Sequence, residues 1–246
     1  MCGIAGLIGA RDEPRAETLL RMAAMLRHRG PDGYGLYLDD HVGLAHTRLS
    51  IIDLAGGAQP LCNEDRSIWI SFNGEIFNYI ELKAGLETRG HRFGTRSDTE
   101  VIVHAYEEWG PQAWKRFNGQ FAFAIWDSTQ HQLWLVRDRV GILPLFYACT
   151  DRGTVFGSEA KALFASGAVT PEADLQGMDE VFPLWGAIPP ATPFRGVSQV
   201  RPGGLVTWED GRITADRAWW TPDVTGGRAG DVDLEELMRD SVRLRL

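Results

Sequence analysis

The chain has 246 residues, of which 44% are apolar and 24% are charged. This is the composition of an ordinary globular protein, and it excludes a collagen-like, coiled-coil or disordered chain. Acidic residues outnumber basic ones by 33 to 25, so the formal net charge is −8. Because nucleic-acid binders normally carry a basic excess, and because no apolar run approaches the ~20 residues of a membrane span, we expect neither a nucleic-acid nor a membrane partner.

Three cysteines, Cys2, Cys62 and Cys149, are widely spaced and form no CxxC pair. This pattern argues against a disulfide framework and against a zinc site, and a reducing cytoplasm is the simplest setting. The six histidines show no metal-ligating spacing, so we expect no bound metal. The first residues lack the basic segment that opens a signal peptide.

The predicted elements are short strands with a few helices between them. Apolar or alternating segments predict strands at 3–8, 35–38, 42–46, 49–53, 68–72, 121–126, 132–137, 145–148, 155–157, 205–208 and 212–215. Apolar spacing of three and four residues, together with capping residues, predicts helices at 14–26, 79–88, 99–109, 159–165 and 234–246. Two segments rich in glycine and proline are predicted to be a structured loop at 29–35 and a linker at 221–230.

The segment 121–126, with the sequence FAFAIW, is apolar on both faces. A strand of this kind is expected to be covered on both sides. Together with the number of short strands, it favours an α+β fold with two packed sheets and helices outside.

Cys2 is the most informative single residue. If Met1 is removed, Cys2 becomes the first residue, and its thiol and free α-amine lie on the same residue. An α-amine has an unperturbed pKa near 7.7–8.0, so it can act as the base that activates the thiol. The alternative interpretation of Cys2, taken alone, is a small buried apolar residue.

Three further positions could serve such a nucleophile. The Asn73 side chain and the Gly74 N–H could form an oxyanion hole, although Asn-Gly also occurs in ordinary turns. Arg48 and Asp98 could hold the carboxylate and ammonium groups of an amino acid. Their alternatives are a surface salt bridge for Arg48 and a helix cap for Asp98.

Eight motifs in order make the sequence closely similar to a known family. They are MCGIAG (1–6), RHRGPDGYG (27–35), HTRLSIIDL (46–54), FNGEIFN (72–78), SDTE (97–100), FNGQFAFAIWD (117–127), RDRVGILPLFY (137–147) and GSEAKAL (157–163). Over residues 2–220 the chain resembles the glutaminase domain of glutamine-hydrolysing asparagine synthetase, a class II glutamine amidotransferase. The resemblance implies the N-terminal nucleophile hydrolase fold, a four-layer αββα sandwich of two mainly antiparallel sheets.

The resemblance also implies a role for each matching residue. Cys2 would attack the side-chain amide of L-glutamine, and Asn73 and Gly74 would form the oxyanion hole. Arg48 would bind the α-carboxylate, Glu75 and Asp98 would bind the α-amino group, and the backbone near Ile51 and Ile52 would line the pocket. The implied reaction releases ammonia and then hydrolyses a γ-glutamyl thioester. This half needs no metal or other cofactor.

The family pattern continues into an ATP-dependent synthetase domain, and this sequence shows neither SGGxDS nor GxxxxGK(S/T). We therefore expect residues 221–233 to be a linker and 234–246 to begin a synthetase domain that is otherwise absent. ATP and Mg²⁺ would belong to that domain, which would amidate aspartate or a related acceptor. The expected partners are glutamine, a synthetase domain or subunit, and a second copy docked through the apolar stripe of 234–246.

Two alternatives stay open from the sequence. One is an N-terminal-cysteine hydrolase of another amide, against which the Arg48 and Asp98 pair argues. The other is a non-catalytic or truncated module, against which the intact Cys2, Asn73 and Gly74 argue.

Overall fold

The structure is a computed structural model that describes residues 1–9, 15–209, 211–224 and 233–245. Within these residues, two six-stranded sheets contain only antiparallel neighbours. The first has the order β10–β8–β9–β1–β3–β2, formed by β1 (Gly3–Ile8), β2 (Gly33–Leu38), β3 (Val42–Arg48), β8 (Phe146–Thr150), β9 (Gly153–Gly157) and β10 (Ser198–Gln199). The second has the order β12–β11–β7–β6–β5–β4, formed by β4 (Leu61–Cys62), β5 (Ile68–Ile76), β6 (Gly119–Asp127), β7 (Gln132–Arg137), β11 (Gly204–Glu209) and β12 (Arg212–Ala218).

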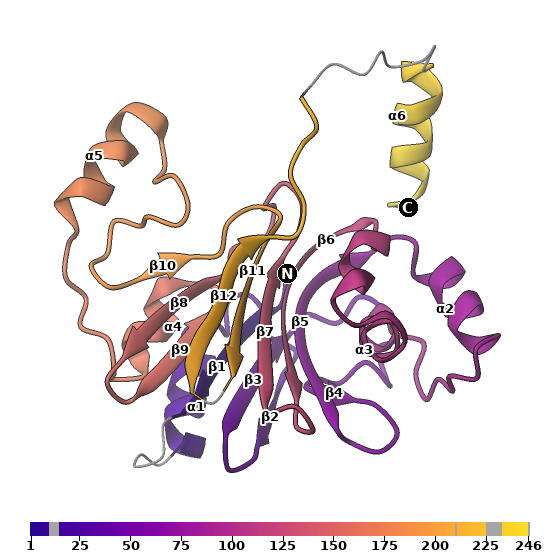
Figure 1. Cartoon of the computed structure of the whole chain (residues 1–246), viewed down its shortest axis with the longest axis horizontal. Helices are drawn as coiled ribbons and strands as arrows, with labels where there is room; N and C mark the ends of the chain where they lie inside the picture. Colours follow the sequence, from indigo (N-terminus) through magenta and orange to yellow (C-terminus); the bar gives the residue numbers. More distant parts are fainter. Residues whose placement is uncertain (10–14, 210, 225–232, 246) are drawn as a thin grey trace.

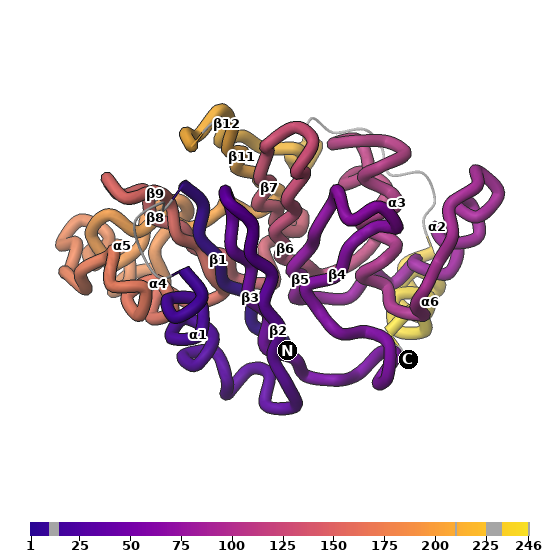
Figure 2. Tube along the Cα trace, turned by 90° about the horizontal axis from the view of Figure 1, so that it is seen from below, coloured from indigo at the N-terminus to yellow at the C-terminus, as the bar shows by residue number. Residues whose placement is uncertain are grey.

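Helices cover the outer faces of both sheets (Figures 1 and 2). The pair α1 (Arg15–Met25) and α4 (Ala160–Ala165) packs on the first sheet, and the pair α2 (Tyr79–Glu87) and α3 (Asp98–Trp109) lies on the second. The remaining helices are η1 (Gly110–Arg116), α5 (Leu175–Leu184) and α6 (Leu234–Arg243). Three apolar clusters fill the spaces between these four layers, so the predicted αββα sandwich is confirmed.

Strand β6 shows how the sequence builds two of these layers at once. Phe121, Phe123 and Ile125 belong to the cluster beneath α3, whereas Ala122 and Ala124 belong to the cluster between the sheets. All five are fully buried, and burial of a large apolar side chain stabilises a fold by about 1.5–3 kcal/mol. The small alanines let the two sheets approach, which explains the two-sided apolar pattern.

Most predicted elements form within a few residues of their expected bounds. The predicted strand at 49–53 is wrong, because this segment is an irregular loop after β3. The predicted loop at 29–35 is too long, because β2 already begins at Gly33. The short strands β4 and β10 and the helices η1 and α5 were not predicted. The expected helix start at Pro14 and most of the expected linker, residues 225–232, lie outside the described residues.

The predicted C-terminal helix forms as α6, with the Asp233 side chain accepting hydrogen bonds from the N–H groups of Glu235 and Glu236. Its apolar stripe is exposed, and each of its members is more than half accessible: Leu234, Leu237, Met238 and Val242. In the described part of the chain, no helix combines the length and apolar character that a membrane span requires.

Candidate functional site

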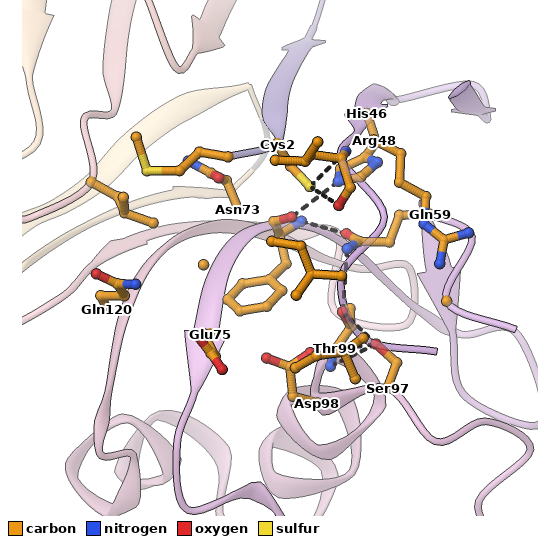
Figure 3. Close-up of a pocket in the computed structure, with 18 residues that line it drawn as sticks. Cys2, His46, Arg48, Gln59, Asn73, Glu75, Ser97, Asp98, Thr99 and Gln120 are labelled. Carbon is orange, nitrogen blue, oxygen red and sulfur yellow. Dashed lines mark hydrogen bonds between the residues drawn. The ribbon is translucent and has the colours of Figure 1, made fainter. Parts of the chain in front are cut away.

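One pocket gathers every site residue that the sequence predicted. Its lining includes Cys2, Arg48, Ile51, Ile52, Asn73, Gly74, Glu75 and Asp98. These residues come from the position directly before β1, the end of β3 and the loop after it, the second half of β5 and the start of α3. Figure 3 shows Cys2, Asn73 and Arg48 toward one end and Glu75 and Asp98 toward the other.

The backbone of Cys2 is fixed by side chains from two other motifs. Arg29 Nε donates to Cys2 O at 3.0 Å, and its Nη1 donates to Glu159 Oε1 at 2.9 Å. Burial alone would raise the pKa of Glu159, but hydrogen bonds from Arg29, Lys161 and His28 lower this pKa to about 2. Glu159 is therefore ionised at neutral pH and anchors the guanidinium that holds Cys2.

The thiol of Cys2 is half-buried beside the loop after β3. Leu49 N–H donates to Sγ at 3.4 Å, and Sγ lies 3.6 Å from Leu49 O. Burial raises the pKa of the Cys2 thiol, and the Leu49 hydrogen bond only partly opposes this shift. At neutral pH the thiol is therefore mostly protonated, so a nucleophilic Cys2 needs a base nearby.

The Asn73 carboxamide is the most unusual polar group of the site. The residue is fully buried, and neither Oδ1 nor Nδ2 has a hydrogen-bond partner among the described residues. Unpaired buried amides are costly and rare, so an amide that lines a pocket is suited to a ligand. Gly74 follows with φ at +153°, and a Cβ there would lie 2.3 Å from Gln120 O. Only glycine fits beside Asn73.

Arg48 explains why the segment after β3 is not a strand. Its Nη2 donates to Asp53 O at 2.6 Å and its Nη1 to Leu54 O at 3.3 Å, which folds the loop back onto β3. Asp53 has a φ of +47°, and its carboxylate accepts from the N–H groups of Gly56 and Arg96. Ile51 is 72% exposed at the pocket instead of being buried in a sheet.

Asp98 lies in the first turn of α3 and not at its N-cap, which is Ser97. Its Oδ2 accepts from Ile76 N–H at 3.0 Å. Burial raises the pKa of Asp98 to about 6, although the Ile76 hydrogen bond opposes the shift and the nearby charge of Glu75 adds to it. Glu75 and Asp98 therefore form a negative end of the pocket that favours a cation.

Two of the lining residues to which the sequence analysis gave no role contact the backbone of Phe72. His46 Nε2 donates to Phe72 O at 3.1 Å, since a carbonyl oxygen can only accept. Burial lowers the pKa of His46 to about 4, so the imidazole is neutral at pH 7. Gln59 Oε1 accepts from Phe72 N–H at 2.7 Å. His46 opens the motif at 46–54 and Gln59 lies outside all eight motifs, but the role of each depends on contacts with β5 that the sequence does not display.

A cluster of two histidines and a glutamate lies away from this pocket. His91, His104 and Glu107 place potential ligand atoms within 4.8 Å of one another, a grouping that their sequence spacing did not reveal. His104 Nδ1 lies 2.6 Å from Glu107 Oε2. Burial alone would lower the pKa of His104, but interactions with Glu100 and Glu107 raise this pKa to about 9. The imidazole of His104 thus lies in a network of carboxylates, those of Glu64, Glu100 and Glu107.

Two antiparallel sheets between helical layers, with a cysteine directly before the first central strand, define the fold of N-terminal nucleophile hydrolases. Two solved structures share it, the allosteric regulatory enzyme of purine biosynthesis and the glutamine phosphoribosylpyrophosphate amidotransferase of Bacillus subtilis. Their TM-scores are 0.67 and 0.65 at 21% and 20% identity, and each match covers 90% of this chain and 50% of the other.

Sequence comparison identifies the family within that fold. Residues 1–220 match the glutamine amidotransferase domain, and the chain belongs to this family. It is 40% identical over 219 residues to asparagine synthetase 1 (glutamine-hydrolysing) of Bacillus subtilis, covering 87% of this chain and 34% of the relative. It is 48% identical over 170 residues to asparagine synthetase 2 of the same organism, covering 67% and 22%. The resemblance and the enzyme class predicted from the motifs are confirmed, and the chain spans about a third or less of these relatives.

Proposed function

We propose that this chain hydrolyses L-glutamine to L-glutamate and ammonia through a thioester on Cys2. The observation that supports this most directly is the buried, unpartnered Asn73 carboxamide in the same pocket as a thiol. The pocket also presents a guanidinium, Arg48, and two carboxylates, Glu75 and Asp98. These opposite charges match the α-carboxylate and α-ammonium groups of an amino acid whose side-chain amide would reach Cys2.

The reaction would begin with removal of Met1. The freed α-amine of Cys2 accepts the thiol proton through a water molecule, and Sγ attacks the side-chain carbonyl carbon of glutamine. The oxyanion that forms is stabilised by the Asn73 Nδ2–H and the Gly74 N–H. Collapse of this intermediate breaks the C–N bond, and the protonated α-amine returns its proton so that ammonia leaves. A water molecule, deprotonated by the same amine, then hydrolyses the thioester to glutamate.

The ammonia would serve an ATP-dependent synthetase domain or subunit that amidates aspartate or a related acceptor. The relatives that are glutamine-hydrolysing asparagine synthetases support this assignment. ATP and Mg²⁺ would act there, and the glutaminase half would need neither a metal nor another cofactor. In this proposal residues 2–220 form the glutaminase domain, 221–233 a linker and 234–246 the start of the synthetase part. The exposed stripe of α6 would then contact the synthetase part or a second copy, in the cytoplasm.

Ammonia release from L-glutamine by protein that begins at Cys2 tests the glutaminase activity. We expect turnover with glutamine and little with simple amides that lack the α-carboxylate and α-ammonium groups. Cys2→Ala serves as the control, because it removes the nucleophile and keeps the pocket. Equal rates with glutamine and with a simple amide would favour the alternative hydrolase, and no release at all would favour a non-catalytic module.

We expect Arg48→Ala to raise KM for glutamine far more than it lowers kcat. The guanidinium has five N–H groups and gives two of them to loop carbonyls, so three remain for a carboxylate. Loss of a desolvated charge pair costs about 2–5 kcal/mol, which is roughly 30-fold or more in KM. Steady-state kinetics test this, with Arg27→Ala, an exposed arginine outside the pocket, as the control. A fall in kcat alone would contradict the assignment.

Glutamine binding should weaken in acid because Asp98 must be ionised to pair with an ammonium group. Its pKa of about 6 in the free protein lies above the usual carboxyl value. The fraction ionised therefore falls about tenfold in all between pH 8 and pH 5, and the affinity falls with it. Calorimetry on the Cys2→Ala chain from pH 8 to pH 5 would measure this. Asp98→Asn in the same background should bind weakly at every pH, and an unchanged acid limb there would assign the titration to another group.

A further inference from the structure

A hydrogen-bonded chain of side chains connects the two ends of the pocket. At one end, Asn73 follows Phe72 on β5, and at the other, Asp98 follows Ser97 at the start of α3. These two segments carry the proposed oxyanion donor and the proposed ammonium site. Their separation decides whether one glutamine molecule can reach both, so a group that fixes it would set the geometry of catalysis.

This hydrogen-bonded chain of side chains begins at Phe72, just beyond the point where the pairing of β4 with β5 stops. Strand β4 pairs Leu61 with Ile70 and Cys62 with Trp69, and the same register would place residue 59 opposite Phe72. The backbone ladder does not extend there, because Pro60 has no N–H to donate. The Gln59 side chain takes the place of the missing strand, and its Oε1 accepts from Phe72 N–H at 2.7 Å. His46 Nε2–H donates to Phe72 O at 3.1 Å.

The other end of the Gln59 amide reaches α3. Its Nε2 donates to Thr99 Oγ1 at 3.2 Å. Thr99 Oγ1 lies 3.0 Å from Ser97 Oγ, which caps α3 and lies 3.4 Å from Asp98 Oδ1. Ser97 and Thr99 are buried, so water does not readily replace these contacts. Figure 3 shows this path from the strand of Asn73 through Gln59 to Ser97 and Thr99.

We propose that Gln59 is a positioning residue whose carboxamide couples the Asn73 strand to the Asp98 helix. This inference rests on the proposed function for its kinetic consequence. A glutamine side chain suits the task because one planar amide offers an acceptor to the strand and a donor to the helix. Gln59 does not touch the reacting atoms, so its loss should change where Asn73 and Asp98 lie and not what they do.

The kinetic test uses Gln59→Leu and the matched pair Thr99→Val and Thr99→Ser. We expect Gln59→Leu and Thr99→Val each to lower kcat/KM for glutamine by about 10- to 100-fold, the effect of a misplaced site. Thr99→Ser keeps the hydroxyl and should retain most of the activity. The double variant Gln59→Leu/Thr99→Val should be no slower than the slower single variant, because both changes break one connection. Additive losses, or equal losses in Thr99→Val and Thr99→Ser, would overturn the proposal.

A spectroscopic test separates this proposal from the glutaminase assignment. In ¹⁵N–¹H spectra of the unliganded protein, the side-chain NH₂ peaks of Asn73 should move in Gln59→Leu and in Thr99→Val, and should stay in place in Thr99→Ser. Unmoved peaks in both disrupting variants would overturn the coupling, whatever the wild type does to glutamine. Absence of ammonia release by the wild type, with the peaks moving as expected, would overturn only the glutaminase assignment.

Discussion

Protein that begins at Cys2 should hydrolyse glutamine, whereas the same chain retaining Met1 should be slower by about 10²–10⁴-fold, the usual contribution of a general base. With Met1 in place, the Cys2 nitrogen is a peptide nitrogen and cannot accept a proton. Burial raises the pKa of the Cys2 thiol, so little thiolate forms without a base. Met1 also lines the pocket.

The comparison requires two preparations of one sequence, one with an uncleaved Met1 and one cleaved to expose Cys2, with each N-terminus verified by mass spectrometry. Alkylation of Cys2 should proceed in both, which shows that the thiol is accessible in each. Cys2→Ser in the cleaved form should be much slower than the parent, because an alcohol is a poorer nucleophile at neutral pH. Full turnover by protein shown to carry Met1 would refute the role of the α-amine.

The site residues that the sequence singled out all line one pocket, and each of them belongs to a short local motif. Asn73 and Gly74 lie in the second half of β5, and Asp98 lies in the first turn of α3, so their positions follow from the elements themselves. The segment 49–53 was mispredicted because its two isoleucines favour a strand, whereas Arg48 binds the carbonyl groups of the loop and bends it away.

Contacts between distant elements could not be predicted in the same way. Gln59 acts at the place where β4 ends, and that place depends on the register between β4 and β5. Helix α5 contains Pro183, which disfavours a helix in the sequence, and it exposes Phe182 and, just beyond its end, Trp185. Tertiary context, which a single sequence does not display, decides these features.

Asn73→Ala should lower kcat for glutamine by about 10²–10³-fold and leave KM nearly unchanged. The carboxamide is needed only when negative charge develops on the substrate oxygen, so its loss affects the transition state and not the bound substrate. In the free protein both polar atoms of the Asn73 side chain are buried without a partner among the described residues. An unpaired buried amide costs stability. Its removal should therefore slow the reaction without lowering the melting temperature appreciably.

Asn78→Ala provides a matched control from the same FNGEIFN motif. Asn78 Nδ2 donates to Arg116 O at 3.0 Å, and its Oδ1 accepts from Asn118 N–H at 2.9 Å, outside the pocket. Its loss should cost about 1 kcal/mol of stability and leave kcat unchanged. The two substitutions should thus have different effects: Asn73→Ala should lower turnover, whereas Asn78→Ala should lower only the melting temperature. If Asn73→Ala instead lowered the melting temperature and left kcat intact, the Asn73 amide would serve packing and the oxyanion would have to be held by Gly74 alone.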